Sequence, residues 1–123
     1  LVDKETLLKE SDIITLHIAL NEETRNFITA REINMMKPSA IIINAARGPI
    51  INTNDLAEAL RNGKISGAAL DVFDTEPPLD KNNPLLNLSN TMLMPHIGFA
   101  TEEAFELRLG IVVKNVEKFV KAC

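Results

Sequence analysis

Residues 40–48 read Ala-Ile-Ile-Ile-Asn-Ala-Ala-Arg-Gly, and Pro49 follows them. The first part, residues 40–44, is a short apolar run that ends in an asparagine and leads into a loop of small residues. Short runs rich in β-branched side chains are typical of strands that are buried on both faces, which occur mainly in parallel sheets. This stretch therefore predicts a buried strand of a parallel sheet.

The strands on either side of this one have the same character. Residues 13–18 read Ile-Ile-Thr-Leu-His-Ile, and residues 67–72 begin with small side chains that let a helix pack closely. A shorter strand is predicted over residues 91–94, where Pro95 ends it. The Pro-rich segment 74–88 is a long loop, and long loops in compact domains are often functional.

Helices are predicted between these strands from capping residues and apolar periodicity. Thr29 and Glu32 have the spacing of a capping box. Thr53 or Asn54 can cap the next helix, and Asn62-Gly63 supplies its left-handed stop. The predicted helices cover residues 3–9, 29–36, 53 or 54 to 62, and 101 to the C-terminus.

The last predicted helix begins at Thr101 and has an apolar side that we expect to be buried. That side comprises Ala104, Leu107, Ile111, Val112, Val116, Phe119 and Val120. Helices and strands alternate along most of the chain, and this order predicts the α/β class, with a mostly parallel sheet and helices on both faces. In such folds, ligands bind beyond the carboxyl ends of the strands.

Composition limits the classes of function. The chain has 123 residues, 46% hydrophobic and 24% charged, which indicates one folded, soluble domain. A net charge of −4 without a block of Lys or Arg argues against nucleic-acid binding, and no apolar stretch approaches the roughly 20 residues of a membrane helix. We expect a cytoplasmic protein without metal ligands. Cys123, the single cysteine, is a poor candidate for a nucleophile at the chain end.

Chemically active side chains follow the predicted strands. His17 closes the first strand, Arg47 follows the second, Asp71 ends the third with Glu76 shortly after it, and His96 follows the fourth. Because the carboxyl ends of parallel strands meet at one edge, this places a cation, two carboxylates and two imidazoles together. That composition suits redox chemistry on an anionic oxo-acid.

Each of these residues has a functional and a purely structural interpretation. His96 beside Glu76 could donate the proton that carbonyl reduction requires, or it could be a packed, hydrogen-bonded ring beside a solvated glutamate. Arg47 could bind a substrate carboxylate in a two-pronged geometry or lie on the surface. Asp71 could accept from a nicotinamide carboxamide or from loop amides. His17 is interpreted as structural, because a ring at the end of a buried strand usually has local hydrogen-bond partners.

Three segments together resemble a known family. These are residues 44–48 (Asn-Ala-Ala-Arg-Gly), residues 67–73 followed by Glu76-Pro77, and residues 95–98 (Pro-His-Ile-Gly). In this order and at these spacings, they resemble the signatures of the D-isomer-specific 2-hydroxyacid dehydrogenases. The resemblance spans nearly the whole chain and implies a Rossmann-like domain.

The resemblance implies a role for each matching position. Arg47 would bind the carboxylate and carbonyl of a 2-hydroxy or 2-oxo acid, Glu76 would pair with His96, and His96 would be the acid and base. Asp71 would orient the nicotinamide of NAD, with NADP left open, and intact family members pair as dimers. Backbone at four further positions would line the cofactor, namely Ile18, Ala45, Ala46 and Gly98. Arg47 and His96 would also contact it.

Two features depart from the family pattern. No Gly-x-Gly-x-x-Gly motif occurs in the chain, and Ala19 stands where the family usually has proline. We therefore expect residues 1–123 to be the C-terminal part of an NAD-binding domain, with the glycine loop and the substrate domain absent. Turnover by the isolated chain should be very low. The alternative function is a non-catalytic, NAD-sensing interaction domain like the corepressor branch of the family.

Overall fold

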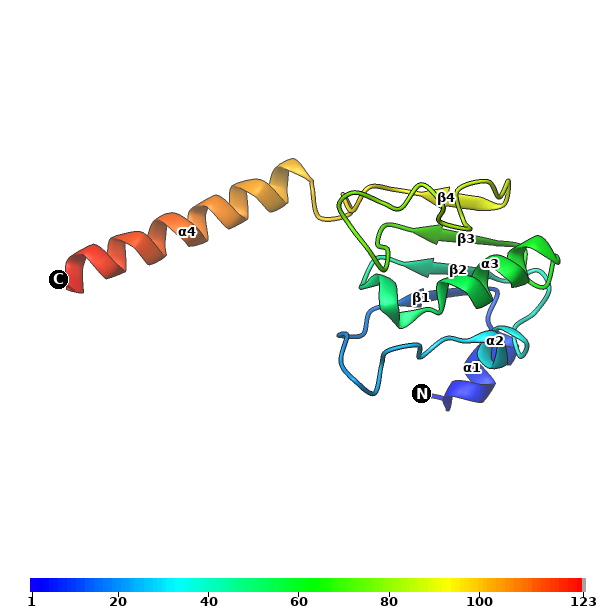
Figure 1. The fold of residues 1–123 in the computed structure, drawn as a ribbon. Coiled ribbons are helices and arrows are strands. Elements are labelled where there is room, and N and C mark those ends of the chain that lie inside the picture. Colours follow the sequence, from blue (N-terminus) through cyan, green and yellow to red (C-terminus); the bar gives the residue numbers. More distant parts are fainter. Residues whose placement is uncertain (123) are drawn as a thin grey trace.

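The computed structural model describes residues 1–122, which form a four-stranded parallel sheet in the order β1-β2-β3-β4 (Figure 1). Every predicted strand is present, although each is shorter by one to two residues at its end or its start. The strands are β1 (Ile13–Leu16), β2 (Ile41–Asn44), β3 (Gly67–Leu70) and β4 (Thr91–Leu93). The predicted α/β class and parallel sheet are therefore confirmed.

The strands end level with one another, which creates a shared edge. Leu16 is paired in register with Asn44, Asn44 with Leu70, and Leu70 with Leu93. The residue after each of these positions therefore emerges at the same end of the sheet. The prediction that the strand-end side chains meet depends on this register.

The helices are α1 (Lys4–Glu10), α2 (Ala30–Ile33), the 3-10 turn η1 (Gly48–Ile50), α3 (Thr53–Arg61) and α4 (Glu102–Ala122). Helices α2 and α3 connect successive strands, whereas α1 precedes β1 and α4 follows β4, in the order that was predicted. The cap of α3 differs from the prediction, because Asn52, not Thr53 or Asn54, accepts from the first-turn amides of Asn54 and Asp55. Asn52 has the extended backbone of an N-cap residue, which lets its side chain accept hydrogen bonds from these amides. Thr53 and Asn54 lie inside the helix and therefore do not occupy the N-cap position.

One face of the sheet contains the core. Ile14, Ile42 and Ala68 are paired in register, so their side chains share a face, and all three are almost fully buried. Helices α2 and α3 lie over one face of the sheet (Figure 1). On the opposite face, Ile13 is 61% exposed and Met92 is 65% exposed. Within residues 1–122, helices thus cover one face, whereas we had predicted helices on both. Crossovers of the same hand between successive neighbouring strands place their helices on the same side of a sheet.

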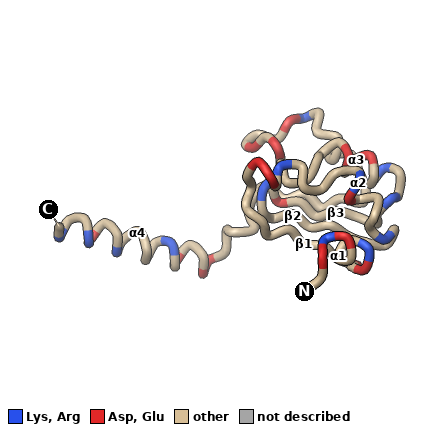
Figure 2. The backbone as a smooth tube through the Cα atoms, turned by 90° about the horizontal axis from the view of Figure 1, so that it is seen from below, with Lys and Arg blue, Asp and Glu red and all other residues tan. Residues whose placement is uncertain are grey.

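The burial predicted for the last helix is wrong. α4 extends away from the sheet (Figure 1), and its apolar residues are exposed, with Leu107 at 68% and Phe119 at 73%. The sequence gives this helix an apolar side, but the described chain offers that side no surface to pack against. Figure 2 shows Lys and Arg interspersed with Asp and Glu along α4. None of the helices in residues 1–122 is long and apolar enough to cross a membrane.

The predicted capping box at α2 is present and contains a carboxylate with little exposure. The Glu32 carboxylate accepts the Thr29 N–H at 3.0 Å and the Thr29 hydroxyl at 2.7 Å, and Lys4 Nζ lies 3.2 Å from it. Burial raises the pKa of Glu32, but the Thr29 hydrogen bonds and the Lys4 charge outweigh it and lower this pKa from 4.5 to about 2. The folded state therefore favours the ionised form.

Glu32→Gln is expected to lower the free energy of unfolding at neutral pH by on the order of 1 to 3 kcal/mol. The ionised carboxylate contributes its stabilisation fully above pH 4.5, and this is lost as the pH falls toward about 2. Urea unfolding at pH 7 and at pH 3 should show the difference between wild type and variant shrinking at the lower pH. Glu58→Gln, at an exposed position of α3, is the matched control and should leave stability almost unchanged.

Candidate active site

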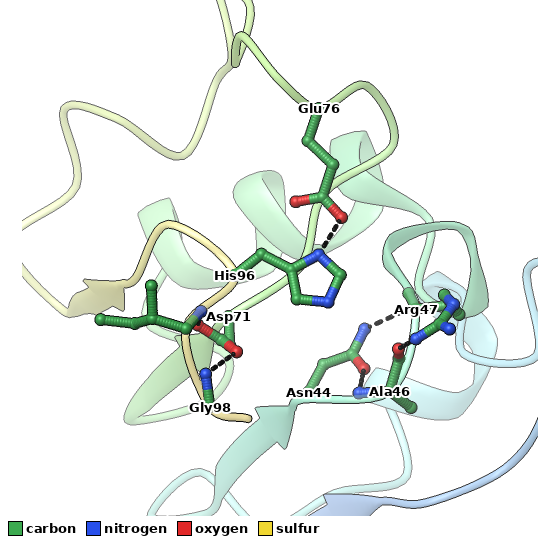
Figure 3. A network of polar contacts seen from close by, with 8 residues as sticks. Asn44, Ala46, Arg47, Asp71, Glu76, His96 and Gly98 are labelled. Atoms are coloured by element: carbon green, nitrogen blue, oxygen red, sulfur yellow. Dashed lines mark hydrogen bonds and ion pairs between the residues drawn. The ribbon is translucent and has the colours of Figure 1, made fainter. Parts of the chain in front are cut away.

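The carboxyl edge of the sheet collects the side chains that were predicted to meet there. His17 directly follows β1, and Asp71 directly follows β3. Arg47 and His96 lie in the loops after β2 and β4. The structure brings Glu76 to this edge from the long loop after β3, next to His96 (Figure 3).

His96 and Glu76 form a direct pair. His96 Nδ1 lies 2.9 Å from Glu76 Oε1, and both side chains are partly buried. The second ring nitrogen of His96, Nε2, faces away from Glu76, toward the side on which Asn44 and Arg47 lie (Figure 3). A carboxylate at Nδ1 fixes the orientation of the ring. This arrangement leaves Nε2 as the ring nitrogen that is open to a ligand.

An apolar cavity of about 500 Å³ borders this pair. The ring of Phe99 packs edge-on against His96, with ring centroids 6.0 Å apart. The other apolar walls are Phe73, Pro77, Leu79, Leu86, Leu93, Met94 and Pro95. The side of the pair that faces this cavity is therefore apolar.

Asp71 is engaged with the backbone of the His96 loop. Its Oδ1 accepts the N–H of Ile97 at 2.8 Å and its Oδ2 accepts the N–H of Gly98 at 2.7 Å (Figure 3). Of the two interpretations that the sequence left open, the structure displays the contact with loop amides. Gly98 permits this approach, because a Cβ at this position would lie 2.8 Å from Asp71 Oδ2.

Asn44 shapes the Arg47 loop, a role that the sequence analysis missed. This buried side chain donates to the Arg47 carbonyl at 2.9 Å and accepts the Ala46 N–H at 3.0 Å. The available signal was a polar residue at the end of an apolar strand, where burial requires hydrogen-bond partners. Arg47 itself is exposed, and its guanidinium donates to the Ala46 carbonyl at 2.6 Å.

Six of the seven residues predicted to contact a cofactor lie along two hollows at this edge, and the seventh, His96, lines the apolar cavity described above. Ile18, Ala45, Ala46 and Arg47 line the hollow at the ends of β1 and β2, which measures about 630 Å³. Ala45 also lines a second hollow, of about 320 Å³, together with Asp71 and Gly98. Small side chains that open two adjoining hollows suit an elongated, flat ligand, so these residues fit a dinucleotide.

Two other predictions concern His17 and metals. His17 is exposed and its Nε2 lies 2.9 Å from the Thr15 hydroxyl, so it has the local partner that was expected, although not the buried position. Across residues 1–122, no group of three or more His, Cys, Asp or Glu side chains is arranged to hold a metal ion. Cys123 lies outside the described residues.

The sequence matches a family model over residues 1–98 of its 123 residues. The family is described as the NAD binding domain of the D-isomer specific 2-hydroxyacid dehydrogenases. The chain belongs to this family. The resemblance that was inferred from the motifs, and with it NAD as the cofactor of the family, is therefore confirmed.

Relatives of the chain are considerably longer than it is. A glyoxylate reductase of Thermococcus litoralis is 51% identical over 98% of this chain and 36% of its own length. A D-3-phosphoglycerate dehydrogenase of Methanocaldococcus jannaschii is 47% identical over 97% of this chain and 22% of its own length. The chain thus spans roughly a third or less of these relatives.

A solved structure has the same fold as this chain. The D-isomer specific 2-hydroxyacid dehydrogenase from Lactobacillus delbrueckii ssp. bulgaricus, in its NAD complexed form, superposes with a TM-score of 0.89. It is 32% identical and is matched over 98% of this chain and 40% of that protein. This likeness confirms the Rossmann-like architecture and agrees with the fit of the edge hollows to a dinucleotide.

Proposed function

We propose that this chain forms the NAD-binding part, including the acid and base, of an oxidoreductase that interconverts 2-oxo acids and D-2-hydroxy acids. The observation that carries the proposal is the His96–Glu76 pair on the same sheet edge as the exposed guanidinium of Arg47. An imidazole held by a carboxylate suits proton transfer near neutral pH, and a guanidinium binds carboxylates with two parallel hydrogen bonds.

His96 moves the proton in the proposed mechanism. Reduction of a 2-oxo acid adds a hydride to C2 and a proton to the carbonyl oxygen, and bound NADH would supply the hydride. His96 donates the proton from Nε2, while Glu76 holds the ring through Nδ1, 2.9 Å away. In the reverse direction, Nε2 accepts the proton of the substrate hydroxyl. The carboxylate beside Nδ1 compensates the charge on the protonated ring.

Arg47 binds and orients the acid. Its guanidinium is exposed and bonded only to the adjacent Ala46 carbonyl among the hydrogen bonds of residues 1–122, so it can turn toward a ligand. A carboxylate held by Arg47 would keep C2 and its oxygen in a fixed position relative to His96. Ile18, Ala45, Ala46, Asp71 and Gly98 are proposed to line the dinucleotide through their positions along the edge hollows.

The proposal separates the complete protein from this chain alone. Residues 1–123 contain no glycine-rich phosphate loop, which in dinucleotide-binding domains supplies the strongest anion-binding element. We therefore propose that the chain alone turns over very little substrate. A homodimer, a cytoplasmic location and the NAD-sensing alternative remain predictions, and the described residues contain no contact that favours the alternative.

The complete protein that contains this sequence should oxidise NADH when given glyoxylate or hydroxypyruvate, as followed by the loss of NADH absorbance. The purified 123-residue chain, assayed at equal concentration, should show almost no rate. NADH binding by the complete protein without any 2-oxo acid reduction would overturn the enzyme proposal in favour of NAD sensing. Steady oxidation of NADH by the chain alone would contradict the prediction that it turns over very little substrate.

A further inference from the structure

The segment that carries His96 has an unusual backbone. His96 has φ of +56°, in the left-handed region that side chains other than glycine seldom adopt. Such conformations are unfavourable for residues other than glycine and persist only when their surroundings fix them. Something on either side of His96 must therefore hold this segment in place.

Two consecutive residues at the end of β3 provide the anchors. Before His96, the Met94 N–H donates to the Leu70 carbonyl at 2.8 Å. After it, the N–H groups of Ile97 and Gly98 donate to the two oxygens of Asp71 at 2.8 and 2.7 Å. The first anchor is an ordinary sheet hydrogen bond, whereas the second depends on one side chain.

We propose that Asp71 is a positioning residue that holds the His96 imidazole in line between Glu76 and the substrate by binding the two amides that follow it. The catalytic consequence rests on the proposed function, but the structural claim does not. Ile97 and Gly98 are exposed residues, so without Asp71 their amides would bind water and leave the backbone free to relax. Relaxation of φ at His96 would turn the ring away from Glu76.

A carboxylate is suited to this task in a way that an amide is not. It offers an acceptor oxygen to each N–H, and hydrogen bonds to a charged acceptor are roughly twice as strong as neutral ones. Asparagine has the same shape, but its NH₂ group would face one of the two N–H donors and leave that amide without its partner. Asp71→Asn therefore removes one bond, and Asp71→Ala removes both.

The test compares Asp71→Asn and Asp71→Ala with wild type and with Asp80→Asn. Asp80 is an exposed carboxylate that accepts the Asn82 N–H in a different loop, so its variant is a matched control. In the 123-residue chain, amide hydrogen exchange reports on Ile97 and Gly98, and NMR of the His96 ring reports on its contact with Glu76. In the complete protein, kcat and KM are measured for glyoxylate, together with the Kd of NADH.

We expect slow exchange of the Ile97 and Gly98 amides in wild type and in Asp80→Asn. In the Asp71 variants, one or both amides should exchange fast, and the NMR signal of the His96 ring should change. The Asp71 variants should lose about 10- to 100-fold in kcat, with little change in the KM for glyoxylate. Fast exchange in wild type, an unchanged His96 signal in the variants, or a weakened Kd for NADH with normal kcat would each overturn the proposal. Should the complete wild-type protein reduce no 2-oxo acid, the proposed function fails, while exchange and the His96 signal still decide the structural claim.

Discussion

Replacing His96 with alanine in the complete protein is expected to lower kcat/KM for a 2-oxo acid by about 10²- to 10⁴-fold, the range that a positioned acid and base contributes. The physical reason is the loss of the proton donor at the carbonyl oxygen, since Nε2 faces the open side of the site while Nδ1 is held by Glu76 at 2.9 Å. Steady-state rates of NADH oxidation with glyoxylate measure the effect.

Two further variants separate proton transfer from packing. His96→Gln retains a polar side chain of similar reach but has no proton to exchange near neutral pH, so its loss should match that of alanine. Glu76→Gln keeps the ring in contact with a hydrogen-bonding neighbour while removing the charge, and a smaller loss of kcat is expected. The Kd of NADH should change little in all three variants, and normal turnover in either His96 variant would refute the assignment.

The sheet and its edge could be predicted because local patterns determine them. Apolar runs rich in isoleucine predicted β1 and β2, and parallel pairing then required their carboxyl ends to meet, which placed Arg47, Asp71 and His96 at one edge. The pairing of Glu76 with His96 was expected from the motifs, but its geometry depends on the path of a loop. Such a path is set by contacts distant in sequence and cannot be read from spacing.

The predictions for α4 and for the second face of the sheet failed for a shared physical reason. Periodicity shows that a helix has an apolar side, but it does not show what covers that side. Residues 1–122 provide no partner for Leu107 or Phe119, and they leave Ile13 and Met92 exposed on the sheet. Whether an apolar side is buried depends on the second surface that packs against it, so the pattern within one helix or strand cannot predict its burial.

The roles of Asn44 and Asp71 show another limit of sequence analysis. Both are polar residues at strand ends, which the sequence marks as places for ligand contacts. In the structure, each uses its side chain to hold a neighbouring loop: Asn44 binds the loop with Arg47, and Asp71 binds the loop with His96. The partners of Asn44 are only two and three residues away, whereas those of Asp71 are 26 and 27 residues away and cannot be identified from residue type alone.

Gly48 links the fold to the site, because it begins η1 directly after Arg47 and lies against the chain beyond β3. A Cβ built on Gly48 would overlap the carbonyl carbon and oxygen of Phe73 and would lie 2.6 Å from the amide nitrogen of Asp74. These are backbone atoms, which cannot turn aside as a flexible side chain can. The close approach holds the Arg47 loop against the segment that leads to Glu76.

Gly48→Ala is therefore expected to lower the free energy of unfolding by more than about 3 kcal/mol, at the upper end of the cost of overpacking, or to prevent folding altogether. Gly110→Ala is the matched control, because nothing lies within 4 Å of its added Cβ and it stands inside α4. Alanine in a helix interior gains up to about 1 kcal/mol over glycine, so this variant should be at least as stable as wild type. Thermal and urea unfolding, followed by circular dichroism, measure both variants. If Gly48→Ala were as stable as Gly110→Ala, the Arg47 loop could move away from the segment that leads to Glu76. The close approach at Gly48 would then not hold Arg47 and Glu76 in a fixed arrangement, as the proposed site requires.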